Sequence, residues 1–151
     1  MCLGMVPLVA YNFGAENIKR MKKFLFITTV SALAFASICT ILFFTFSSDF
    51  VGAFIKDTET VNIGARFLKG RCFALPFMII GYIVVNYMNA INKGIISFIL
   101  ALLRHVVLLI PMMIIMNIIF GMNGLIQSQL YADVMNAAVA IIFLAIVNKK
   151  L

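Results

Sequence analysis

The sequence predicts an all-α membrane protein with four transmembrane helices, preceded by a short N-terminal helical stub. Composition is the first observation behind this prediction. Hydrophobic residues make up 64% of the 151 residues, charged residues make up 11%, and the mean hydropathy is +1.13. A soluble domain of this size could not hide that much apolar surface, because its own surface must carry charge. The second observation is that the apolar residues gather in long runs.

Each of these runs is long enough to cross a bilayer. A helix of about 20 residues matches a hydrocarbon core of roughly 30 Å, and backbone groups in lipid must find their partners within the segment. The strands of a β-barrel would be shorter and would alternate polar with apolar residues. We therefore expect transmembrane helices, with approximate limits 24–46, 72–92, 95–120 and 125–147.

Two other segments are expected to form no span. The apolar stretch before Tyr11 is too short to cross a membrane and looks like the tail of a helix whose beginning is absent. The segment 47–71 is expected to be an outer loop. Its apolar residues, such as Phe50 and Phe54, recur at helical spacing, which favours one or two short amphipathic helices at the interface. A plain extracellular loop is the alternative.

Basic residues predict the orientation of the chain. They sit at the ends of the apolar runs, which favours a lipid bilayer as partner and argues against nucleic acid. One side of the predicted spans carries seven Lys or Arg residues and the other carries four. The positive-inside rule makes the first side cytoplasmic, so we expect a multi-pass protein of the cell membrane with a cytoplasmic C-terminus. The seven are Lys19, Arg20, Lys22, Lys23, Lys93, Lys149 and Lys150.

Motifs typical of enzymes are absent from the sequence. It contains no phosphate-binding loop, no GxSxG and no CxxC. Its one histidine, His105, has no metal-ligating partner at helical spacing. We therefore expect no enzymatic activity, no metal site and no cofactor.

Polar side chains inside the spans mark candidate functional positions, because lipid makes them costly unless they face protein or water. Several fall on one arc of the second span or on one face of the fourth, at spacings of three and four residues. They either line a substrate cavity or form hydrogen bonds between helices, and both interpretations stay open. These candidates are Tyr82, Asn86, Asn89, Gln129 and Asn136.

Two charges inside the spans are expected to pair. Asp133 is the only acid within a span, and Arg104 is the only basic residue well inside one. In antiparallel helices their backbone levels differ by only several ångströms, which an Arg side chain can cover. Because either charge buried alone would be strongly destabilising, we expect an intramembrane ion pair. Its role is interpreted as structural, with a part in transport as the alternative.

The segment 7–23, PLVAYNFGAENIKRMKK, resembles the cytoplasmic signature of the multidrug and toxic compound extrusion (MATE) transporters. In that family a P-[LI]-[VI]-x-Y-N-[YF]-G-A stretch closes a helix before a basic loop. Asn and Gly are typical of helix ends, and basic residues anchor such a loop inside the cell. The residues that carry this part of the resemblance are Pro7, Tyr11, Asn12, Gly14 and Ala15.

The last two predicted spans resemble the same family. LLRHVVLLIPMMIIM is similar to the family's eleventh helix, and GMNGLIQSQLYAD is similar to the turn and opening of the twelfth. Pro111 is also expected to kink its helix. The second span, however, contains no acid, so the sodium-binding acid found in the tenth helix of one MATE branch has no counterpart. The matching residues are Arg104, Pro111, Gly121, Gly124 and Asp133.

The resemblance implies a twelve-helix antiporter of two six-helix lobes. Residues 1–151 would form most of the second lobe, from the end of helix 8 through helix 12. It also implies export of cationic or amphipathic small molecules against inward flow of protons or sodium. The missing N-terminal lobe, from the same gene or a separate chain, would be the partner, and the chain is expected to be inactive alone.

Two other functions are considered beside efflux. A lipid-linked oligosaccharide flippase of a related family has similar helices, but its cavity would be strongly basic, whereas Arg104 is the only basic residue well inside a span. The third hypothesis is a small four-span membrane scaffold that does not transport.

Overall fold

The computed structural model describes residues 2–149, and within them every regular element is a helix. Lys150, which was counted among the basic residues at one side, lies outside this range. The elements in chain order are α1 (Cys2–Gly14), α2 (Ile18–Thr45), α3 (Ser47–Gly52), α4 (Thr58–Ala90), α5 (Gly94–Leu102), the π-helical segment η1 (Leu103–Leu109), α6 (Ile110–Phe120) and α7 (Met122–Lys149).

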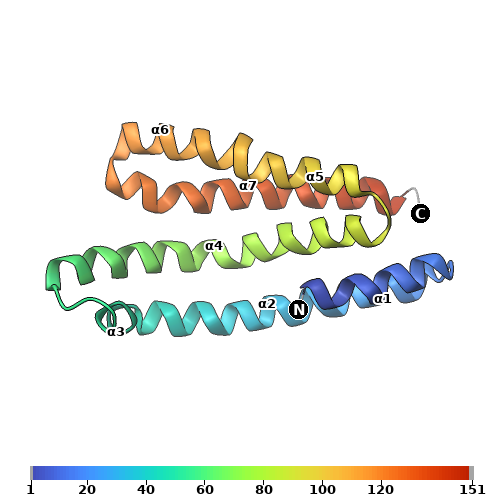
Figure 1. Cartoon of the computed structure of the whole chain (residues 1–151), viewed down its shortest axis with the longest axis horizontal. Helices are drawn as coiled ribbons and strands as arrows, with labels where there is room; N and C mark the ends of the chain where they lie inside the picture. Colours follow the sequence, from blue (N-terminus) through green and yellow to red (C-terminus); the bar gives the residue numbers. More distant parts are fainter. Residues whose placement is uncertain (1, 150–151) are drawn as a thin grey trace.

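The helices form a bundle of long antiparallel arms, with α4 between α2 and α7 (Figure 1). The stretches Ile18–Thr45, Thr58–Ala90 and Gly94–Lys149 are long and apolar enough to cross a membrane. The third stretch reverses at Gly121, so that α5, η1 and α6 run up one arm and α7 returns beside it. The predicted all-α membrane fold is confirmed.

The reversal between α6 and α7 depends on two glycines. Gly121 has φ +57° and ψ −136°, a backbone conformation that side-chain-bearing residues rarely adopt. At Gly124, a Cβ atom would lie 1.9 Å from the carbonyl oxygen of Met116, so the two arms approach too closely for any side chain there. Gly121 and Gly124, the two positions in this turn that match the MATE pattern, therefore each have a steric reason to be glycine.

The segment 47–71, predicted as an outer loop, is mostly helical. α3 is a short helix of the predicted kind, but α4 already begins at Thr58 and continues unbroken to Ala90. Its start is fixed by Asp57, whose side chain accepts a hydrogen bond of 2.9 Å from the Thr60 amide. The second half of the segment is thus the first part of a long helix, and a plain loop does not form.

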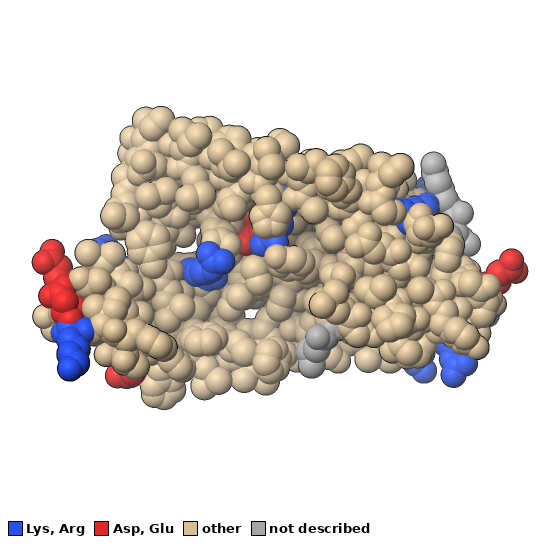
Figure 2. Space-filling model, in the orientation of Figure 1, with Lys and Arg blue, Asp and Glu red and all other residues tan. Residues whose placement is uncertain are grey.

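Many of the charged residues lie at the two ends of the bundle, and the surface between them carries few charges (Figure 2). The turns 15–17 and 91–93 and the last turn of α7 share one end, which we call the basic end. The turn at 15–17 uses Glu16, with φ +56°, and Asn17, which caps α2. Lys22 Nζ donates to the Asn148 carbonyl at 3.5 Å and so links α2 to α7.

The buried core lies toward the basic end. It is centred on Tyr87 and Met88 of α4, both fully buried, and is closed by Val9, Met21 and Leu100 from three other helices. On the outside of the bundle, large apolar side chains are exposed, and Ile118 of α6 is 77% exposed. Such a surface is the expected contact with lipid tails.

Candidate binding cavity

A cavity of about 700 Å³ lies at the end of the bundle opposite the basic end, which we call the cavity end. α4 and α7 form two of its sides, η1 and the start of α6 form another, and α3 contributes Val51. Figure 2 shows a hollow in this half of the molecule, where acidic and basic atoms lie among uncharged ones. Most of the wall is apolar, including Phe67, Met78 and Met113.

The π-helical segment η1 brings two polar residues to this wall. Pro111 has no amide hydrogen, and its ring would clash with the carbonyl four residues earlier in a regular α-helix. The helix widens over Leu103–Leu109, just before the proline, which satisfies this constraint. Arg104 and His105 lie in the widened turns, and both line the cavity. The sequence predicted a kink at Pro111, and the structure shows a π-helical stretch in the turns before it.

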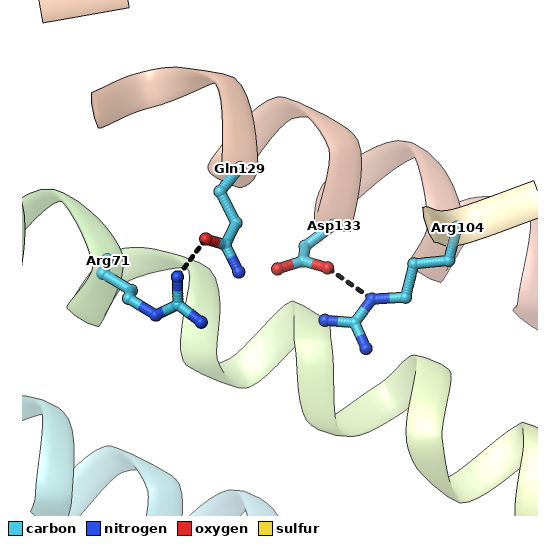
Figure 3. Close-up of polar contacts among 4 residues, drawn as sticks. All are labelled: Arg71, Arg104, Gln129 and Asp133. Atoms are coloured by element: carbon cyan, nitrogen blue, oxygen red, sulfur yellow. Dashed lines mark hydrogen bonds and ion pairs between the residues drawn. The ribbon is translucent and has the colours of Figure 1, made fainter. Parts of the chain in front are cut away.

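The Arg104–Asp133 ion pair is present. Arg104 Nε donates to Asp133 Oδ1 at 2.9 Å, with the two side chains 10% and 2% exposed (Figure 3). The Arg104 guanidinium also lies 4.6 Å from the centre of the Tyr82 ring, a cation–π contact that holds it against α4. Asp133 Oδ2 is buried and has no hydrogen-bond partner within residues 2–149.

A second arginine stands on the same wall. Arg71 of α4 donates a hydrogen bond from Nη1 to Gln129 Oε1 of α7 (Figure 3). Gln129 and Asp133 are four residues apart on α7, so the two arginines contact successive turns of one helix, about 6 Å apart along its axis. Together the two contacts tie α7 to α4 and to η1 across the cavity.

The structure divides the predicted cavity residues into two groups. Tyr82 and Gln129 line the cavity. Asn86 donates from Nδ2 to the Tyr82 carbonyl at 2.8 Å, within its own helix, and does not line it. Asn89 is exposed near the basic end and lies outside the cavity as well. Asn136 of α7 is only 2% exposed and packs against Gly81 of α4. Its Oδ1 has no hydrogen-bond partner among the described residues.

Arg71 and His105 are cavity residues that the sequence did not single out. Arg71 was placed in the outer loop, because the second apolar run begins one residue later. A usable signal was present, since Arg71, Met78 and Tyr82 follow one another at spacings of seven and four on a single helix face. Continuing the helix back past Cys72 would have placed Arg71 beside the candidate cavity.

The motif at 7–15 lies at the basic end, away from the cavity. Pro7 is inside α1, Gly14 is its last residue, and Ala15 N donates to the Tyr11 carbonyl at 3.0 Å. Asn12 is 6% exposed and donates from Nδ2 to the Leu8 carbonyl at 2.7 Å. These contacts end α1 and turn the chain into α2, so this motif has a structural explanation. Within the described chain, no three His, Cys, Asp or Glu residues gather as metal ligands would.

Known proteins resemble this chain in sequence and in the arrangement of the helices. A family model described as MatE matches residues 1–115. The Multidrug export protein MepA of Staphylococcus saprophyticus is 29% identical over 151 residues, which are 100% of this chain and 33% of MepA. MepA of Staphylococcus aureus is 33% identical over the same length, with the same coverage of both proteins. The chain thus spans about a third of the length of the curated relatives it matches.

Solved structures resemble the fold closely. The MATE transporter VcmN of Vibrio cholerae in its bent form matches with a TM-score of 0.90 and 18% sequence identity, over 96% of this chain and 33% of VcmN. A mutant of the same transporter matches with a TM-score of 0.91, over 97% of this chain and 34% of that chain. At this identity the likeness concerns the arrangement of the helices.

Proposed function

Because the chain belongs to the MatE family, we propose that it forms most of the second lobe of a multidrug efflux transporter. In this proposal it corresponds to the end of helix 8 through helix 12 of a twelve-helix protein. The observation that carries the proposal is the match of the whole chain to a third of MepA, a multidrug export protein. The cavity supports it, because a pocket with flexible apolar walls and a few polar groups suits varied amphipathic molecules.

We further propose that transport requires the remaining two thirds of such a protein. Secondary transporters alternate access by moving one lobe against another around a shared site. The cavity of this chain is formed by α3, α4, η1, α6 and α7, which would supply one wall of such a site. Cationic or amphipathic compounds would be exported in exchange for protons or sodium. The isolated chain would then be inactive.

The basic end is proposed to face the cytoplasm of the cell. Six of the seven basic residues counted on this side fall within the described chain, in the first turns of α2, in the turn 91–93 or at the end of α7. Lys and Arg near span ends favour the cytoplasmic side. The cavity would therefore lie in the outer half of the membrane, with the C-terminus inside the cell.

Efflux by a joined protein tests this proposal. In S. aureus MepA, the third that matches this chain is replaced by residues 1–151, and dye efflux is measured in a drug-sensitive host. The joined protein should export dye, whereas the chain alone and MepA lacking that third should not. The matched control is the joined protein with Gly124→Ala, which is expected to prevent the α6–α7 reversal.

Two results would contradict the proposal. Energy-dependent dye efflux by the 151-residue chain alone would show that it needs no second lobe. A joined protein that inserts, remains monodisperse and gives no efflux would argue against a transport role and for a scaffold. Fusing a reporter that is active only in the cytoplasm to the C-terminus tests the orientation. Absence of its signal would contradict the proposal that the C-terminus lies inside the cell.

A further inference from the structure

The cavity carries more positive than negative charge. Of the described residues that line it, Arg71 and Arg104 bear guanidinium groups, and Asp133 is the single carboxylate. Guanidinium groups keep their charge at any physiological pH. A charge excess within an apolar wall is costly in a membrane protein, so such groups usually meet a partner or mark a ligand pathway.

The two arginines keep donors that the protein does not use. Arg104 engages Asp133 through Nε, and its two terminal nitrogens have no acceptor among residues 2–149. Arg71 is exposed and engages Gln129 through Nη1 alone. Since a guanidinium carries five N–H donors, most donors of this pair remain free at the cavity. Figure 3 shows both groups extending into the space between α4 and α7.

The free donors are fixed in place by their neighbours. The Arg104 group is held between Asp133 and the Tyr82 ring, and the Arg71 group is held by Gln129 one turn away along α7. A guanidinium fork fits the two oxygens of a carboxylate or phosphate, which accept its parallel N–H groups. The rest of the wall would contact an apolar body through side chains such as Phe67 and Met113.

We propose that this cavity binds amphipathic molecules that carry an oxyanion, with a carboxylate or phosphate held by Arg71 and Arg104 and an apolar body against the remaining wall. If such a molecule is a transported substrate, which rests on the proposed function, this site would hold it by its oxyanion while its apolar body lies along the wall. The oxyanion can come from such a substrate or from the headgroup of an anionic phospholipid.

A dye with a free carboxylate and its methyl ester, which lacks that charge, test the site. The purified 151-residue chain in detergent micelles is titrated with a xanthene dye that carries a free benzoate, and with the methyl ester of that dye, by fluorescence anisotropy. The free acid should bind roughly tenfold more tightly than the ester. In Arg71→Gln this preference should vanish, while binding of the ester changes little.

Arg66→Gln is the matched control. Arg66 is an exposed arginine of the same helix, but it does not line the cavity, so its loss should leave the preference for the acid intact. Circular dichroism and size-exclusion chromatography show whether each variant folds. Arg71 is chosen over Arg104 because Arg104 also balances the charge of Asp133.

A second measurement separates the two sources of the oxyanion. Phosphatidylglycerol that copurifies with the wild type, Arg66→Gln and Arg71→Gln is quantified by mass spectrometry. Selective loss of this lipid from Arg71→Gln assigns the site to a lipid phosphate; retention, together with the dye preference, assigns it to a substrate carboxylate. Equal binding of acid and ester by the wild type, with no lipid difference among the variants, overturns the proposal.

The two proposals fail separately. Loss of the dye preference with intact efflux by the joined protein would remove the oxyanion site and leave the transporter function. A clear preference without efflux would leave a binding site and remove the transport role.

Discussion

At the basic end, α4 and α7 pack closely around Tyr87 and Met88. At the cavity end the same two helices flank the charged wall and touch again where Gly70 meets Ile126. The boundary between the two regions is the contact of Gly81 in α4 with Asn136 in α7. On the basic side of this boundary α7 contributes Ala140, which permits close approach to the core. On the other side it contributes Gln129 and Asp133, which reach across to arginines.

The comparison shows how two long helices can combine close packing with a cavity. Lipid offers helices little hydrophobic gain from association, so small residues and interhelical hydrogen bonds must hold them together. The basic end uses close packing for this purpose. The cavity end adds polar contacts of Gln129 and Asp133 to the close approach of Gly70 and Ile126, and these contacts place charge beside the cavity. The expected effects of substitutions should therefore differ in kind between the two ends.

The largest expected effect comes from reversing one charge of the ion pair. Arg104→Asp or Asp133→Arg should each destabilise the fold by about 3–5 kcal/mol, because a charge is left without its partner in apolar surroundings. The double reversal should recover much of this loss. Folded yield and thermal unfolding in micelles measure it, with Asp49→Arg, at an exposed position of α3, as control. Failure of the double reversal to recover any folded protein would contradict a pair held mainly by charge.

A smaller effect is expected at the boundary. In Gly81→Ala the new Cβ would lie 2.4 Å from Asn136 Nδ2, so this side chain must move. Because only a side-chain end is displaced, we expect a loss of about 1–3 kcal/mol in the free energy of unfolding. Adding Asn136→Ala should restore part of it, as measured by thermal unfolding. A double variant less stable than Gly81→Ala would show that the Asn136 amide, and not its volume, holds the boundary.

Tyr82 and Tyr87, five residues apart on α4, allow the two ends to be compared with one residue type. The Tyr87 hydroxyl donates to Asn148 Oδ1 at 2.8 Å in the buried core, whereas the Tyr82 hydroxyl at the cavity has no such partner in the described chain. Tyr87→Phe should therefore cost roughly 1 kcal/mol and Tyr82→Phe close to nothing. Equal melting temperatures for the two variants would count against a polar tie between α4 and α7 at the basic end.

The smallest effect concerns the start of α4 and depends on pH. The Thr60 hydroxyl, followed by its amide, lowers the pKa of Asp57 from its usual value. A depressed pKa in the folded state means that the cap stabilises α4 above the unfolded pKa of about 4 and is lost as the pH falls through the folded value. Amide exchange at Thr60 should be faster in Asp57→Ala than in the wild type at neutral pH. This difference should shrink in acid, and a difference that grows there would contradict the assignment.

Much of the fold could be predicted from the sequence, because lipid imposes simple length and hydropathy rules. The apolar runs predicted the long helices. The charges of Arg104 and Asp133, isolated within apolar spans, predicted the ion pair that these two residues form. The start of α4 was missed, since residues 58–71 are too polar to resemble a span and their helix depends on the Asp57 cap and on packing against α3. Arg71 was missed for the same reason.

The division of the polar stripe also could not be predicted. Tyr82, Asn86 and Asn89 share one arc of α4, but whether a position meets a cavity depends on how far α7 and η1 stand from it at that level. Nearer the basic end, the Asn86 amide donates a hydrogen bond to the Tyr82 carbonyl of its own helix, and Asn86 does not line the cavity. The widening of η1 before Pro111 likewise follows from proline chemistry, but its length is set by the surrounding helices.

One measurement tests the central claim most directly, namely that the cavity end serves transport while the basic end serves packing. In the joined MepA protein, Gln129→Ala at the cavity is compared with Val84→Ala in the buried core. Initial dye efflux is divided by the amount of folded protein in the membrane. Gln129→Ala should lower efflux per molecule at an unchanged amount, and Val84→Ala should lower the amount at unchanged efflux per molecule. The reverse pattern, or two variants that lose only folded protein, would contradict the account.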